Sequence, residues 1–136
     1  MLFKMGKFFS AWLPPILWMG LIFFLSSFHK LQASQIGWQD FIVRKTAHFL
    51  EYAVLCFLYF RALRQTTSWS SKKSFFLALF LAFIYALSDE YHQTKVTGRT
   101  GKIFDVGVDF CGAIFGGIFF KKLIGKLPEK IKKLTL

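Results

Sequence analysis

Long apolar stretches alternate with short polar segments along the chain. The first stretch, at residues 8–28, contains no charged side chain, and it meets the length of about 20 residues that is needed to cross the hydrocarbon core of a bilayer. Three more apolar stretches follow, at about residues 43–63, 75–91 and 104–120. A segment inside a bilayer must satisfy its own backbone hydrogen bonds, so we predict that all four stretches are helices.

The pattern therefore predicts an all-α fold, an integral membrane four-helix bundle that forms a single domain over residues 1–136. A soluble bundle would need a polar outer face on each helix, and these stretches lack one. Residues 121–136 form a basic tail after the fourth helix. We expect no cleavable signal peptide, because the first stretch is too long and lacks a small-residue cleavage site.

The distribution of positive charge predicts the orientation of the helices. If each stretch crosses the membrane, 12 of the 18 lysines and arginines lie on the side of the two termini. The six on the opposite side are Lys30, Arg44, Lys45, Lys95, Arg99 and Lys102. Lysine and arginine concentrate on the cytoplasmic side of membrane proteins. We predict a multi-pass protein of the cell membrane with both termini cytoplasmic and with the loops near residues 29–42 and 92–103 facing outward.

Composition supports the membrane assignment and limits the partners. Hydrophobic residues make up 54% of the chain and charged residues 18%, and the mean hydropathy is +0.45, whereas a soluble domain has about 25% charged residues. The formal net charge of +11 indicates anchoring against anionic lipid. No nucleic-acid recognition motif is present, so we expect no nucleic-acid partner. Cys56 and Cys111 lie inside apolar stretches, where a disulfide is not expected.

The scarce carboxylates gather toward the outward ends of the predicted helices. Six of the seven acidic residues lie there, and the exception is Glu129. Ionisable side chains inside a membrane protein are rare and are functional candidates by default. We therefore predict a polar site at or just below the outer surface, formed by the second, third and fourth helices.

Helical spacing selects the side chains that share a face. The predicted faces carry Lys45, His48, Glu51 and Tyr52 on the second helix, Tyr85, Asp89 and His92 on the third, and Asp105, Asp109, Gly112 and Gly116 on the fourth. The two glycines match the G-x-x-x-G spacing that lets helices approach closely, so we expect the two aspartates above them to point into the bundle. Gly98 and Gly101 suit a turn that presents Arg99 inward.

Three segments resemble the VanZ-like membrane proteins: RKTAHFLEYAVL at residues 44–55, SDEYHQ at residues 88–93 and GRTGKIFDVGVDFCGAIFG at residues 98–116. The family pattern falls on Lys45, His48, Glu51, Tyr52, Asp89, Glu90, His92, Gln93, Arg99, Asp105 and Gly112. This chain departs from the pattern at Asp109, where the family often has asparagine. The resemblance implies a small helical membrane domain and, for some members, reduced susceptibility to lipophilic glycopeptides such as teicoplanin.

The candidate residues suit an anionic amphiphile at the outer leaflet. Lys45 and Arg99 are able to hold a phosphate or a carboxylate, Arg99 through its bidentate fork, and a histidine beside a carboxylate supplies an acid–base pair. The acid–base candidates are His48, Glu51, Asp89, Glu90 and His92, and the binding candidates are Lys45, Tyr52, Gln93, Arg99, Asp105 and Asp109. A membrane lipid or a lipid-linked cell-wall intermediate would present both phosphate and apolar tail, and a glycopeptide is a further candidate partner.

Two other interpretations of the same residues stay open. Five basic and five acidic groups balance at the site, so they could form a structural clamp between the helices. A divalent metal such as zinc could bind His48, Glu51, His92 and either Asp89 or Glu90. However, HFLE at residues 48–51 lacks the second histidine of the H-E-x-x-H motif.

Three classes of activity are compatible with the predicted site. A non-enzymatic binding or protection protein requires least of the residues and is our first interpretation. A membrane enzyme that modifies a lipid or lipid-linked headgroup is the second. Transport is the weakest, because four short helices leave little room for alternating access.

Overall fold

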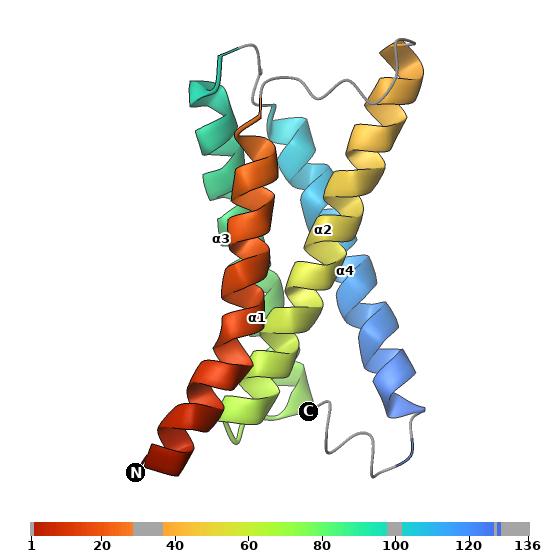
Figure 1. The fold of residues 1–136 in the computed structure, drawn as a ribbon. Helices are drawn as coiled ribbons and strands as arrows, with labels where there is room; N and C mark the ends of the chain where they lie inside the picture. Colours follow the sequence, from red (N-terminus) through yellow and green to blue (C-terminus); the bar gives the residue numbers. More distant parts are fainter. Residues whose placement is uncertain (1, 29–36, 98–101, 127, 129–136) are drawn as a thin grey trace.

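The computed structural model describes residues 2–28, 37–97, 102–126 and 128, and this part of the chain contains four helices and no strand. The helices are α1 (Leu2–Ser26), α2 (Gly37–Thr66), α3 (Ser71–Lys95) and α4 (Ile103–Gly125). They alternate in direction and pack into one bundle (Figure 1). The predicted all-α four-helix bundle is confirmed, and the helices extend beyond the predicted apolar stretches because several polar flanking residues are also helical.

The two ends of the bundle differ in charge. We call the end where α1 and α3 stop and α2 and α4 start the polar end, which lies at the top of Figure 1. The opposite end, the basic end, contains no described carboxylate. Its described lysines and arginines are Lys7, Arg61, Arg64, Lys72, Lys73, Lys121, Lys122 and Lys126.

Within the part of the chain that the structure describes, three helices are long and apolar enough to cross a membrane: α1 over residues 6–26, α3 and α4. They expose large apolar side chains such as Leu17, Phe76 and Phe115. Soluble monomers rarely expose large contiguous apolar patches, so these surfaces are suited to lipid rather than to water.

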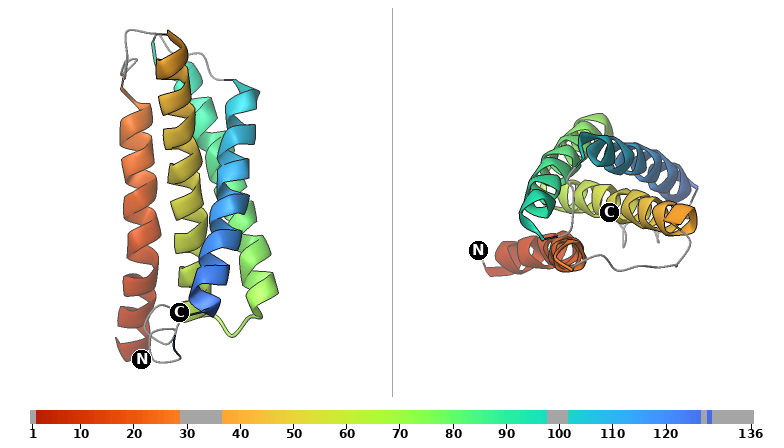
Figure 2. Two further views of the ribbon diagram at one scale, coloured as in Figure 1. Left: turned by 90° about the vertical axis from the view of Figure 1, so that its right-hand side faces the viewer. Right: turned by 90° about the horizontal axis from the view of Figure 1, so that it is seen from above.

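The second predicted apolar stretch lies within α2, which differs from the other three helices. Its charged residues keep it out of the set that is apolar enough to span on composition alone. It lies in the middle of the bundle instead and contacts α1, α3 and α4, while α1 lies furthest from α4 (Figure 2). Tyr52, Leu55 and Cys56 of α2 are fully buried, so this helix supplies much of the core.

Two glycines bring α4 against α2. A Cβ atom at Gly112 would overlap the backbone of Phe49, and one at Gly116 would overlap the backbone of Ala53. Only a residue without a side chain fits at these two positions, which is the physical basis of the G-x-x-x-G contact. The predicted close approach of α4 is confirmed, and it fixes α4 in register with the polar half of α2.

Small residues also position the inner face of α3. The helix starts after the N-cap Ser70, whose hydroxyl accepts a hydrogen bond from the Lys73 N–H at 3.3 Å. Ala78, Ala82 and Ala86 follow at four-residue spacing and are buried. This alanine stripe leads directly to the buried carboxylates at the polar end of α3, so their placement inside the bundle follows from the face that the alanines define.

Candidate functional site

Two charge pairs connect α2 and α4 at the polar end. The Lys45 ammonium forms an ion pair with the Asp105 carboxylate. One turn further into the bundle, Nδ1 of His48 lies 3.2 Å from Oδ1 of Asp109. The Lys45 side chain is 21% exposed whereas that of Asp109 is 1% exposed. The pairs therefore form two levels, an accessible one and a buried one.

Two neighbouring carboxylates from α3 reach the same end of the bundle. Asp89 accepts a hydrogen bond from the Gln93 amide at 2.9 Å, within α3. Glu90 accepts from the backbone N–H of Lys102, the residue that precedes α4. Asp89, Glu90 and Gln93 are all buried. Through Glu90 the end of α3 is thus tied to the start of α4.

Tyr52 and Glu51 of α2 complete the inner level. Tyr52 is fully buried and interacts electrostatically with Asp89 and Asp109. His48 interacts in the same way with Glu51 and Asp89. We refer to the following side chains as the polar cluster: Lys45, His48, Glu51, Tyr52, Asp89, Glu90, Gln93, Asp105 and Asp109. They come from three helices, as the sequence predicts.

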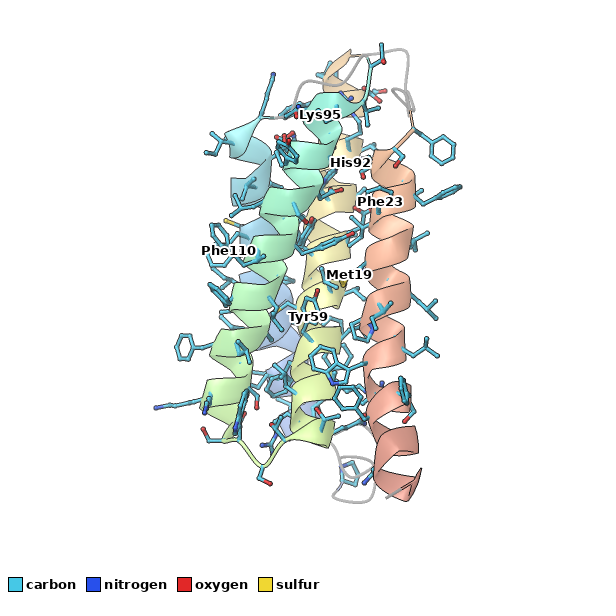
Figure 3. The ribbon with its side chains drawn as sticks, turned by 90° about the vertical axis from the view of Figure 1, so that its left-hand side faces the viewer. Met19, Phe23, Tyr59, His92, Lys95 and Phe110 are labelled. Atoms are coloured by element: carbon cyan, nitrogen blue, oxygen red, sulfur yellow. The ribbon has the colours of Figure 1, made fainter. Side chains whose placement is uncertain are left out.

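The side chain of His92 points away from the polar cluster and toward α1. Its Nε2 lies 3.0 Å from Oγ of Ser27. Its ring lies over the ring of Phe23 in α1, with 4.2 Å between the two centroids, and Figure 3 shows His92 beside Phe23. Tyr85 also turns toward α1, because its hydroxyl donates to the Met19 carbonyl at 2.6 Å. The face that carries Tyr85, Asp89 and His92 is therefore divided, because Tyr85 and His92 reach α1 whereas Asp89 faces the inside of the bundle.

The sequence model of the VanZ/LLP1 family matches residues 9–125. The chain belongs to the VanZ/LLP1 family. No curated protein and no solved structure matches the chain. Together with the apolar helices, the family match makes this a VanZ-like membrane protein.

Within this VanZ-like bundle, one predicted site residue cannot be placed. Arg99 lies outside the described residues, together with the glycines on either side of it. The other ten candidates lie within the described helices. All of them belong to the polar cluster except His92, which contacts α1.

The side chains considered as alternative metal ligands do not come together in the described part of the VanZ-like bundle. Within the described residues, no group of three or more histidine, cysteine, aspartate or glutamate side chains is arranged to hold a metal ion. The separation of His48 from His92 explains this result, because the two histidines face α4 and α1 respectively.

Several buried oxygen atoms of the polar cluster make no hydrogen bond to any described residue. They are the Tyr52 hydroxyl, Oδ1 of Asp89, Oε2 of Glu90 and Oδ2 of Asp109. A buried acceptor that lacks a donor destabilises a protein by about 1–3 kcal/mol. The three buried carboxylate oxygens among these atoms can be protonated, or they can accept hydrogen bonds from hydroxyl or ammonium groups.

One contact of the cluster was absent from the sequence prediction. The indole N–H of Trp18, in the middle of α1, donates to the Glu51 carbonyl at 2.9 Å. An indole N–H within an apolar span needs an acceptor, so a mid-span tryptophan is the signal that could have indicated this contact. It attaches α1 to α2 at the level of the inner charge pair.

Proposed function

We propose that this protein is a multi-pass protein of the cell membrane, with cytoplasmic termini, whose polar cluster binds an anionic amphiphile at the outer leaflet. The proposed ligand is a membrane lipid or a lipid-linked cell-wall intermediate. The more accessible level of the cluster, with the Lys45 ammonium, would receive the phosphate. The tail would stay in the bilayer against the apolar outer surfaces of the helices.

The unpaired carboxylate oxygens are the observation that carries this proposal. A cluster with only a structural role would be expected to satisfy its buried acceptors, because leaving them unpaired is destabilising. Asp89, Glu90 and Asp109 each retain a buried oxygen without a donor among the described residues. Hydroxyl or amino groups of a headgroup would supply those donors while Lys45 holds the phosphate.

The two levels of the cluster restrict the chemistry of the proposed headgroup. A headgroup that carries phosphate alone would meet Lys45 but would leave the carboxylates unsatisfied and would be repelled by them. A headgroup with both phosphate and hydroxyl or amino donors fits both levels. Glycosylated lipid phosphates and phospholipids with hydroxylated or amino headgroups belong to this class.

A membrane enzyme is the second candidate, and the His48–Asp109 pair favours it. An imidazole oriented by a carboxylate is the usual form of a general acid–base catalyst. His48 lies beside further carboxylates, since Glu51 and Asp89 both interact with it electrostatically. Such a site would transfer a proton during modification of the bound headgroup.

Two measurements test the proposal. The protein with wild-type sequence and the Lys45→Met variant are purified in native lipid discs, and the retained amphiphiles are identified by mass spectrometry. Lys72→Met is the matched control, because it removes one lysine charge at the basic end of the bundle, in the first turn of α3. We expect loss of a retained phosphate-bearing amphiphile from Lys45→Met alone. Equal retention by all three proteins would refute the binding proposal.

The second measurement separates binding from catalysis in cells. Envelope lipids are compared between cells that lack the protein and cells that overproduce it. A changed headgroup supports the enzyme, and an unchanged lipid composition supports binding. Susceptibility to teicoplanin is measured on the same strains, because the family resemblance links some members to that phenotype.

A further inference from the structure

A cavity of about 300 Å³ opens at the basic end, far from the polar cluster. It lies between the first turns of α3 and the last turns of α4, and it is lined by Phe75, Ile118, Lys121 and Lys122. The first comes from α3 and the other three from α4. None of the four belongs to the proposed amphiphile site, so this cavity needs an explanation of its own.

The cavity wall has an apolar part and a cationic part. Phe75 and Ile118 supply the apolar part, and the two lysines supply the charge. Nζ of Lys121 lies 5.4 Å from the centroid of the Phe75 ring, so the two parts meet at that residue. Within the described residues neither lysine forms an ion pair, so no described carboxylate neutralises their charge.

A glycine shapes the apolar part. A Cβ atom at Gly117 would lie 2.6 Å from Cε2 of Phe75 and 3.1 Å from Sγ of Cys56. The missing side chain therefore allows the Phe75 ring to lie directly against α4. The ring is thereby held as one wall of the cavity, between the backbone of α4 and the lysines.

The cavity also lies at the boundary between apolar and basic sequence. The apolar stretch of α4 ends immediately before Lys121, and that of α3 begins immediately after Lys72, Lys73 and Ser74. In a bilayer this boundary lies at the depth of the phospholipid phosphates and glycerol groups. Lysines here are able to meet a phosphate while the apolar wall meets the first methylene groups of an acyl chain.

We propose that this cavity binds one anionic glycerophospholipid of the adjacent leaflet. Its phosphate lies between Lys121 and Lys122, and the beginning of one acyl chain packs against Phe75 and Ile118. Basic pockets between membrane helices bind acidic headgroups in this way. A cavity of this size is at the lower limit for ligand sites, so it holds the glycerophosphate portion rather than the whole lipid. A zwitterionic lipid is disfavoured, because its own cation competes with the lysines for the phosphate.

The test uses the full chain in phosphatidylcholine discs that contain increasing amounts of phosphatidylglycerol. Native mass spectrometry counts the phosphatidylglycerol molecules that the released protein retains. All proteins in this comparison carry Lys45→Met, which removes the proposed amphiphile site, so the count reports on the cavity. In this background the Lys121→Gln/Lys122→Gln variant should require about tenfold more phosphatidylglycerol for the same retention. The Lys72→Gln/Lys73→Gln variant loses the same charge at the same end of the bundle but changes no cavity residue, and it should retain lipid as the protein with Lys45→Met alone does.

A steric variant tests the cavity without changing its charge. Ile118 lines the cavity and is 43% exposed. The larger side chain of Ile118→Trp should therefore fill the cavity without disturbing the packing of the core. We expect it to lose phosphatidylglycerol to the same extent as the Lys121→Gln/Lys122→Gln variant. Retention by Ile118→Trp, or equal losses from the two double-lysine variants, would mean that the lipid is attracted only by general surface charge, and either result overturns the proposal.

Discussion

His48 of α2 lies against Asp109 of α4, with Nδ1 of the histidine 3.2 Å from Oδ1 of the aspartate. One turn further along α4, Gly112 meets the backbone of Phe49, the residue that follows His48. The position of the pair is thus set by backbone contact between the two helices rather than by the length of the side chains. A change of charge at Asp109 should therefore leave the geometry of the helices intact.

Asp109→Asn uses this property to separate the two candidate functions. The asparagine oxygen can still accept a hydrogen bond from His48, but it cannot stabilise a protonated imidazole. We predict that amphiphile retention in native lipid discs falls by about tenfold, because the amide N–H replaces Oδ2, one of the oxygens without a described donor, while Lys45 and the oxygens of Asp89 and Glu90 are kept. If the protein is an enzyme, headgroup modification should instead fall by about 10²-fold or more.

The control for this experiment is Asp109→Leu, which removes the acceptor as well as the charge. It should reduce retention and lower the thermal stability, because His48 is then left without its partner. Normal retention by Asp109→Asn, with helicity and melting temperature unchanged, would contradict the binding model of the cluster.

The two glycines of α4 should tolerate no side chain. Gly112→Ala and Gly116→Ala place a methyl group inside the backbone of α2, and overpacking of this kind destabilises by about 1–3 kcal/mol or more. Gly107→Ala is the matched control, since nothing lies within 4 Å of a Cβ atom there, and alanine in a helix is favoured over glycine by about 1 kcal/mol.

Unfolding of the purified protein in detergent, followed by far-ultraviolet circular dichroism, checks this prediction. The melting temperature should fall for the first two variants and should stay constant or rise for Gly107→Ala. Similar melting temperatures for all three variants would mean that α2 and α4 do not depend on this contact.

Substitutions of Glu90 should distinguish its structural contact with Lys102 from its proposed contact with the ligand. One carboxylate oxygen accepts from the Lys102 N–H, and the other, Oε2, has no described donor. Glu90→Gln keeps a carbonyl oxygen for Lys102 but replaces the second oxygen by an N–H donor. We predict a near-normal melting temperature and a loss of about tenfold or more in amphiphile retention, the size expected for a hydrogen bond to a charged group.

Glu90→Ala should lower both quantities, because it also removes the acceptor for Lys102. The comparison of the two variants in the same discs is the measurement. Normal retention by the Glu90→Gln protein would show that Oε2 does not contact the ligand.

Membrane orientation can be tested at two exposed loop positions. In a background of Cys56→Ala and Cys111→Ser, single cysteines are placed at Thr97, after α3, and at Ser68, between α2 and α3; both positions are exposed. The charge asymmetry of the chain predicts that an impermeant thiol reagent labels the first in intact cells and labels the second only after lysis. The reverse pattern would place the polar cluster on the cytoplasmic side.

Sequence spacing predicted which residues occupy one level of the bundle, because the apolar stretches fix the depth of each polar side chain. It also predicted the close approach of α4, since only glycine leaves space for a neighbouring backbone. It did not reveal that Phe49 and Ala53 would be the residues approached. The partner of a G-x-x-x-G stripe depends on the rotation of another helix, which the stripe does not encode.

His92 shows the same limit more clearly. Its spacing from Tyr85 and Asp89 is compatible with one broad helix face, but that face is divided between two neighbours. Tyr85 and His92 reach α1, while Asp89 lies inside. Positions three or four residues apart differ by tens of degrees around the axis, and a divided face can be recognised only once the positions of both neighbouring helices are known.

The contact of Gly112 and Gly116 with α2 also determines how a ligand can enter. Backbone against backbone leaves no lateral gap between α2 and α4 along this part of the bundle. If an amphiphile binds as we propose, it cannot slide sideways between these two helices, and its headgroup would have to descend from the polar end while its tails remain in the surrounding bilayer. Exchange then depends on the headgroup alone, and lipids that share a headgroup but differ in acyl-chain length should enter and leave at the same rate.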